Sequence, residues 1–318
     1  MPPLNRHHLS LLFIISLPFF FGGATCQQWS QPPVPSAPVL FVTPPTLDAV
    51  LTAINENTRR VNKLQTDSAI LTIAGVPAKL RTSIALEQPQ RFRLQGRVFA
   101  PELDLGSNDE LFWFWAKSNP DRAFYFARHA DYAQSGASRV LPVKPQWLIE
   151  AFGLITLDEN SFHEGPYPRG EGVFEIRSHL TAAAGRLERT LVIDDKGWIV
   201  EQTIADERGQ VLAHVNASEH RFDPISGASL PHQIAIELPQ ANLSLQINVA
   251  DYSINQLYSD PSELWKLPVM DGYNLVNVAS LEHVGPPEYL PALRAGPPNH
   301  QEIRSRFRPS YRGYTTLR

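Results

Sequence analysis

The sequence predicts a mainly β (α+β) protein in which one strongly curved antiparallel sheet forms a whole or partial barrel, with helices that plug or cover its mouth. Apolar and polar residues alternate with a period of two through much of the 318-residue chain, which is typical of strands with one buried face. Only one long segment, 46–64, has apolar residues at helical spacing. One helix of about five turns cannot cover the apolar side of about ten strands, so we expect the sheet to curl around that side.

Residues 229–252 show the alternation most clearly and are expected to form the hairpin around which the sheet is organised. Its second arm places four apolar side chains on one face, Leu243, Leu245, Ile247 and Val249. Proline cannot continue a strand ladder, so Pro239 to Ala241 are predicted to form the turn. The same alternation predicts further strands at 80–87, 91–98, 111–115, 123–128, 174–180, 187–193, 198–204 and 210–222.

The helix at 46–64 has the residues that a helix start requires. Thr46 can cap it, and Asp48 lies in the first turn, where the helix dipole favours an acid. A second, short helix is predicted at 145–153, with proline at its start. Residues 158–172 contain glycine and proline and are predicted to form a loop.

Two apolar segments stand out as candidate ligand-binding surfaces. The run from Leu111 to Trp115 is apolar on both faces, so this strand is either covered on both sides or exposes aromatic surface. The short helix at 145–153 has a high proportion of apolar residues for its length, and it is either a lid or part of the core. The residues predicted to line a cavity or lid are Leu94, Phe112, Phe114, Trp147, Leu148 and Phe152.

The two ends of the chain are predicted to lie outside the folded domain at 46–284. Residues 1–25 have a short apolar run followed by small residues, as in a secretory signal peptide. The only cysteine, Cys26, follows Gly23-Ala24-Thr25, an imperfect lipobox; it is either a lipid anchor or a leftover thiol after cleavage at Ala24. Residues 26–45 are a proline-rich tether, and residues 285–318 are a disordered basic tail.

Composition excludes several classes of function. A formal net charge of −4 gives no reason to expect a nucleic-acid partner, and a single cysteine allows no internal disulfide. The sequence contains no phosphate-binding glycine loop, no His-Glu-x-x-His and no Gly-x-Ser-x-Gly. His129 and His163 are interpreted as solvated side chains. We therefore expect no catalytic residue, no metal and no cofactor.

Three short motifs carry a family resemblance. They are Gln88-Pro89-Gln90-Arg91-Phe92-Arg93-Leu94, Asn108-Asp109-Glu110-Leu111-Phe112-Trp113-Phe114-Trp115, and Leu230-Pro231-His232-Gln233-Ile234 with its long following strand. With the leading helix, their order resembles the LolA/LolB-like lipoprotein-carrier superfamily of bacterial envelope lipoproteins, over about residues 46–280. The resemblance implies a half-open barrel with a helical lid, and carrier members hold acyl chains of lipoproteins in the cavity. A lipidated Cys26 would make the chain more like the membrane-anchored receptor than the soluble carrier.

The leading hypothesis is a non-enzymatic envelope lipoprotein, exported to the periplasm and anchored to the outer membrane through Cys26. Its partners would be acyl chains or lipoproteins bound in an apolar half-barrel. The alternative is a protein-interaction or envelope-sensor module of the same fold, in which the protein's own side chains fill the cavity. Ligand identity, transport direction and oligomeric state stay open at this point.

Overall fold

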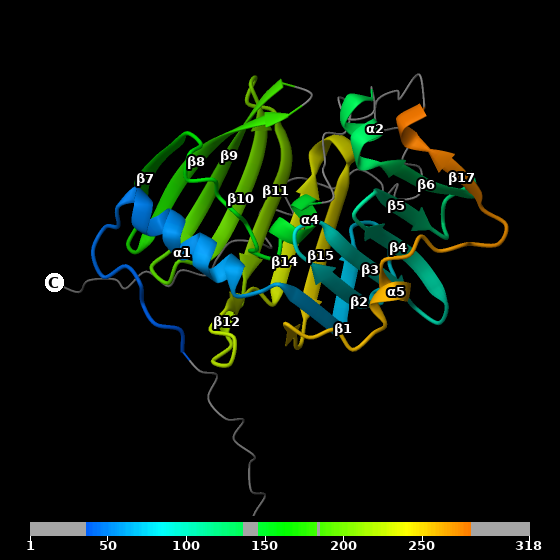
Figure 1. The fold of residues 1–318 in the computed structure, drawn as a ribbon, viewed down its shortest axis with the longest axis horizontal. Helices are drawn as coiled ribbons and strands as arrows, with labels where there is room; N and C mark the ends of the chain where they lie inside the picture. Colours follow the sequence, from blue (N-terminus) through cyan, green and yellow to red (C-terminus); the bar gives the residue numbers. More distant parts are fainter. Residues whose placement is uncertain (1–35, 136–145, 183–184, 281–318) are drawn as a thin grey trace, which may run out of the picture. The chain divides into compact units, whose positions relative to one another are not determined.

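The computed structural model describes residues 36–135, 146–182 and 185–280 (Figure 1). The predicted signal peptide, Cys26 and the basic tail lie outside the described residues. Most of the described chain belongs to one 15-stranded sheet, whose path is β17-β6-β5-β4-β3-β2-β1-β15-β14-β11-β10-β9-β8-β7. The sheet is curved but not closed, because its path ends at β7 on one side and β17 on the other. The mainly β prediction is confirmed, and the helical lid stays a prediction.

The sheet is built from two antiparallel meanders. The first comprises β1 (Lys63–Ile73), β2 (Leu80–Glu87), β3 (Arg91–Arg97), β4 (Pro101–Ser107), β5 (Leu111–Ala116) and β6 (Ala123–Arg128). The second comprises β7 (His163–Gly170), β8 (Val173–Ala182), β9 (Gly185–Asp194), β10 (Ile199–Asp206) and β11 (Val211–Ser218), followed by β14 (Gln233–Leu238) and β15 (Leu243–Val249).

The predicted central hairpin is confirmed as β14 and β15, which pair antiparallel around the short 3₁₀ helix η1 (Pro239–Ala241). β15 also pairs with β1, from Ala69 opposite Val249 to Ile73 opposite Leu245. The hairpin therefore joins the two meanders into one sheet. The remaining strands are short: β12 (Arg221–Phe222) pairs with β13 (Ser229–Leu230), β16 (Ser253–Ile254) pairs with β1, and β17 (Asn274–Asn277) runs parallel to β6.

The first helix is shorter than the sequence predicted. α1 spans Leu47–Arg59, with Thr46 as its N-cap, and the chain then enters β1 at Lys63. Leu64 therefore lies in a strand, and the prediction of helix to residue 64 was wrong. The cause is tertiary, because residues 63–73 gain strand partners on both sides, β2 and β15, which helical spacing cannot reveal.

The other helices are α2 (His129–Gln134), α4 (Gln146–Glu150), α5 (Pro261–Leu264) and the 3₁₀ helix η2 (Val278–Ser280). α4 confirms a short helix within the predicted 145–153. The prediction of a loop at 158–172 was wrong, because β7 occupies His163–Gly170. β7 contains Pro166 and Pro168 but lies at the edge of the sheet, where proline need not donate to a neighbouring strand.

One side of the sheet, which we call the helix face, is covered by α1 and by the segment 146–157 (Figure 1). The opposite side of β5 is also covered, because Trp113, Trp115 and Phe124 pack against residues of the segment 267–273. Of the two alternatives for this strand, the side with Trp113 and Trp115 is buried, whereas Phe112 and Phe114 on the other side are only partly buried. At the other end of the described chain, the amides of Leu40 and Phe41 both donate to the Asp195 carbonyl, at 2.9 Å.

Candidate functional site

α4 and the residues after it cross the helix face near the junction of the two meanders. Ile149 and Phe152 are buried in one cluster with Phe92 and Leu94. The Phe152 and Phe92 rings lie 6.3 Å apart, centroid to centroid. Leu148 is partly buried against the same cluster. The apolar side chains of this segment therefore fill the space over β3 and the strands beside it.

Trp147 packs in the opposite direction, toward the second meander. It forms a separate cluster with Leu187 of β9, Ile204 of β10 and Leu212 of β11. The short helix α4 thus contributes to two clusters at once. Any movement of α4 away from the sheet would expose apolar surface on both meanders.

A half-buried aromatic surface continues the helix face over β5 and β6. Phe114 stacks on Tyr125, with centroids 6.3 Å apart and ring planes 10° apart. Phe112 meets Tyr132 of α2 edge-on at 5.0 Å and lies 5.7 Å from the His129 ring. Burial raises the pKa of Tyr132 to about 12, as expected for a phenol in apolar surroundings. This part of the face is aromatic and less deeply covered than the part under α4.

A buried ion pair connects α4 to the sheet. Glu150 of α4 contacts Arg189 of β9, and the two residues are only 6% and 4% exposed. Arg189 lies between Leu187 and Leu191 along its strand, so its side chain points to the helix face among apolar neighbours. Among the described residues, the Arg189 Nε has no hydrogen-bond partner.

The sequence interpretation missed this pair, although one signal was present. In the alternation of β9, an arginine occupies a position that should be apolar. A charge at an inward position requires a partner, since an isolated buried charge is costly. Glu150 is the only acidic residue within the predicted helix 145–153.

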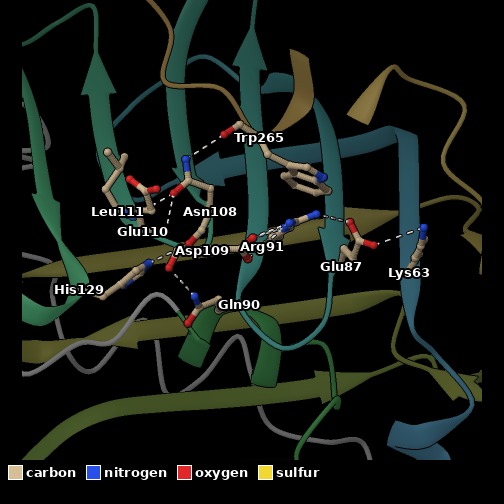
Figure 2. A network of polar contacts seen from close by, with 10 residues as sticks. All are labelled: Lys63, Glu87, Gln90, Arg91, Asn108, Asp109, Glu110, Leu111, His129 and Trp265. Carbon is tan, nitrogen blue, oxygen red and sulfur yellow. Dashed lines mark hydrogen bonds and ion pairs between the residues drawn. The ribbon is translucent and has the colours of Figure 1, made fainter. Parts of the chain in front are cut away.

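A polar network fixes the β4–β5 turn that leads into the aromatic surface. Figure 2 shows Arg91 between Asp109 and Glu87, with its Nε 3.0 Å from Asp109 Oδ1 and its Nη1 3.1 Å from Glu87. The hydrogen bonds from Arg91 hold the pKa of Asp109 below its usual value. Asn108 donates to the Trp265 carbonyl at 2.9 Å, and its own carbonyl lies 2.9 Å from the His129 Nε2. These contacts position the first residues of β5 and of α2.

The structure therefore brings four of the six predicted site residues into one cluster, Leu94, Phe114, Leu148 and Phe152. Trp147 lies in a separate cluster, and Phe112 packs with His129 and Tyr132. Ligand contact by any of the six stays a prediction.

The described residues contain no group of three or more His, Cys, Asp or Glu side chains that could hold a metal ion. His163, interpreted as solvated, is partly buried, with its Nδ1 2.7 Å from the Ser178 hydroxyl. None of the helices in the described part of the chain is long and apolar enough to span a membrane.

No family model matches the sequence, and no curated protein matches it. Among solved structures, the chain is similar to an outer membrane lipoprotein-sorting protein domain from Vibrio parahaemolyticus, at 11% identity and a TM-score of 0.43, covering 67% of this chain and 95% of that one. It is also similar to a LolA superfamily protein from Nitrosomonas europaea, at 12% identity and a TM-score of 0.43, with 70% and 98% covered. A third similar structure is a DUF1329 family protein from Desulfovibrio piger, at 12% identity and a TM-score of 0.42, covering 70% of this chain and 100% of that one.

With TM-scores below 0.5, these likenesses carry no argument about the fold or the function of this chain.

Proposed function

We propose that this chain is a non-enzymatic envelope protein that binds an acyl chain, free or attached to a lipoprotein, on the helix face. The observation that supports this is the cover of that face. A five-residue helix, joined to the sheet by a buried ion pair, lies over apolar clusters of both meanders. In this proposal α4 is the lid, and an acyl chain takes the place of its side chains.

The free energies set a minimum size for the ligand. Withdrawing Trp147, Leu148, Ile149 and Phe152 from the sheet would cost about 2 kcal/mol each, or roughly 8 kcal/mol together, and separating Glu150 from a still buried Arg189 would add about 3–5 kcal/mol. Burying an acyl chain gains about 0.8 kcal/mol for each methylene, so about fifteen buried methylenes, or an equal apolar area, gain roughly 12 kcal/mol. Only a ligand of that size can therefore displace α4.

The ion pair suits a reversible contact. The attraction between Glu150 and Arg189 is largely offset by the cost of removing both charges from water. Such a pair specifies the closed position of α4 without adding much to its stability. The half-buried rings of Phe114 and Tyr125 would then be the place where a ligand first meets the face.

The N-terminal sequence supports a location in the envelope. A signal peptide at 1–25, a lipidated Cys26 and the proline-containing residues between Cys26 and the packed segment 37–41 would hold the domain near the outer membrane. One acyl chain binds a membrane only marginally, so lasting anchoring would need further chains on Cys26.

One observation favours the second candidate, a protein-interaction or sensor module of the same fold. Residues of the chain itself fill the helix face at Phe152 and Ile149. Two large pockets, of about 410 and 440 Å³, lie elsewhere, beside α1 and beside the β4–β5 turn. If α4 never leaves the helix face, that face is part of the hydrophobic core. Partner proteins would then bind surfaces outside it, such as those two pockets.

The test is native mass spectrometry of the full chain purified from its own envelope, followed by titration with the fluorescent fatty acid 11-(dansylamino)undecanoic acid. We expect one acyl chain per protein. Phe114→Ala should weaken probe binding about tenfold, because a half-buried ring contributes about 1.4 kcal/mol. The matched control is Phe99→Ala, whose ring is 101% exposed at the β3–β4 turn, and it should bind like the unmodified chain.

A chain that carries no lipid and takes up no probe would contradict the acyl-binding proposal and leave the interaction module. Equal weakening by Phe114→Ala and Phe99→Ala would show that the probe binds outside the helix face.

A further inference from the structure

A groove of about 410 Å³ lies on the side of α1 that faces away from the sheet. Its walls are the segment 37–41, the exposed side of α1, the β9–β10 turn and the loop between β12 and β13. Aromatic rings enter it from three different segments, Phe41, Trp198 and Phe222. The groove does not belong to the helix face, because α1 separates the two.

Two acidic side chains line the α1 wall of this groove, Asp48 and Glu56. Both are exposed, and among the described residues the structure gives no ion pair to Asp48. Glu56 is 3.8 Å from Arg60, an exposed contact that exchanges easily with another cation. Lys196 Nζ lies 4.7 Å from the centre of the Trp198 ring, which shows that this ring accepts a cation. Two basic side chains also line the groove, Lys196 over that ring and Arg60, whose Nη1 donates to the Gly227 carbonyl at 2.7 Å. The two acids of the α1 wall and the rings opposite them fit a segment with positive charges and rings.

The chain contains such a segment beyond the described residues. Residues 291–318 contain six arginines and one glutamate, which give a formal charge of +5. Because the whole chain has a net charge of −4, the first 290 residues have a net charge of −9. Within it, Arg304, Arg308 and Arg312 recur every four residues, and Pro309 and Tyr311 lie between the last two.

The spacing of these arginines matches the spacing of the acids. Asp48 and Glu56 are eight residues apart on a helix, which corresponds to about 12 Å at about 1.5 Å per residue. Arg308 and Arg312 are four residues apart, which is also about 12 Å in an extended or polyproline conformation at about 3.1 Å per residue. Pro309 and Tyr311 would then lie between the two ion pairs, opposite the aromatic wall.

The segment can also reach the groove. The described chain ends at Ser280, beside β17 and β6. From β17 to β10 the sheet path has ten steps of about 4.8 Å, or about 48 Å along the sheet. The 24 residues from Ser280 to Arg304 can span about 80 Å when extended.

We infer that the segment Arg304–Arg312 of the chain folds back into the groove, with Arg308 and Arg312 paired to Asp48 and Glu56. The contact is intramolecular, and it covers the side of α1 that lines the groove without touching the helix face. This inference is independent of the acyl-binding proposal.

The test measures hydrogen exchange of the amides in 304–314 by mass spectrometry on the full chain. The variant Asp48→Lys/Glu56→Lys leaves the tail sequence, and hence its intrinsic exchange rates, unchanged. We expect these amides to exchange at least five times faster in that variant than in the unmodified chain. Combining Asp48→Lys/Glu56→Lys with Arg308→Glu/Arg312→Glu reverses the charges on both sides of the contact and should restore slow exchange of these amides. The reference for this combined variant is Arg308→Glu/Arg312→Glu alone, which has the same tail sequence. The matched control, Glu159→Lys/Glu207→Lys, makes the same change in net charge at exposed acids away from the groove and should have no effect.

Three results would overturn the inference. Equal exchange in the unmodified chain and in Asp48→Lys/Glu56→Lys would show that the groove does not hold the tail. Slow exchange that disappears on tenfold dilution would assign the groove to the tail of a second copy. Protection that appears only with vesicles containing phosphatidylglycerol would make the tail a membrane-binding segment.

Discussion

The Glu150–Arg189 pair can be tested by a double-mutant cycle. Removing the carboxylate with Glu150→Met leaves the Arg189 charge buried at 4% exposure, with its Nε already without a hydrogen-bond partner among the described residues. Loss of one partner of a buried pair costs about 3–5 kcal/mol. We expect Glu150→Met to lower the free energy of unfolding by that amount, a large share of the stability of a typical domain.

Replacing both charges should give the opposite result. In Glu150→Met/Arg189→Met, both side chains are apolar and neither requires desolvation; methionine matches glutamate in length and is two atoms shorter than arginine. Such replacements are neutral or stabilising by about 1–4 kcal/mol in comparable buried pairs. The double variant should therefore be at least as stable as the unmodified chain, within about 1 kcal/mol, although Arg189→Met alone is destabilised.

Urea unfolding followed by tryptophan fluorescence measures all four stabilities, with equal m-values as the check on two-state behaviour. A coupling free energy above about 2 kcal/mol is expected. Additive single variants, each costing less than about 1 kcal/mol, would refute the argument, because they would show that water reaches both charges.

Two further predictions concern stability. Burial lowers the pKa of His220 to about 4. Between pH 6.5 and 4 the unfolded chain therefore binds a proton at His220 that the folded chain does not. The free energy of unfolding should fall as the pH drops through this range, by at most about 3 kcal/mol. Urea midpoints at pH 7, 5.5 and 4.5 should fall less steeply for His220→Phe, and equal slopes would contradict this. A Cβ on Gly106 would lie 2.0 Å from the buried Trp113 ring, so Gly106→Ala should cost about 3 kcal/mol. In Gly170→Ala the new methyl meets nothing within 4 Å, so a similar loss there would assign the effect to glycine replacement in general.

Where alternation was clean, the sequence was a sufficient guide to the fold. The β14–β15 hairpin and the β9–β10 turn at Asp194–Gly197 lie where the pattern places them, because one face of each strand is buried. β1 was missed because Leu64 continues the helical spacing of α1, and only its partners on both sides reveal a strand. β7 was missed because Pro166 and Pro168 are compatible with a strand only at an edge, which is a property of the whole sheet.

The candidate site was predictable only where a local pattern of apolar residues indicates burial. Leu94 is apolar at an alternating strand position and Phe152 belongs to the apolar segment 145–153, and both are buried. The division of α4 between two clusters depends on how the meanders meet, which no local pattern contains. Glu150 and Arg189 are 39 residues apart, and only the folded sheet brings them together.

The place where β1 meets β15 has a consequence for synthesis of the chain. Residues 63–73 leave the ribosome long before residues 243–249, so the second partner of β1 does not exist for most of translation. Until then β1 is the outer strand of a half-finished sheet, with an unpaired backbone edge and apolar side chains such as Leu71 and Ile73. In an exported chain this exposed edge would persist through secretion, and a chaperone that shields extended apolar strands would be needed most at this stage.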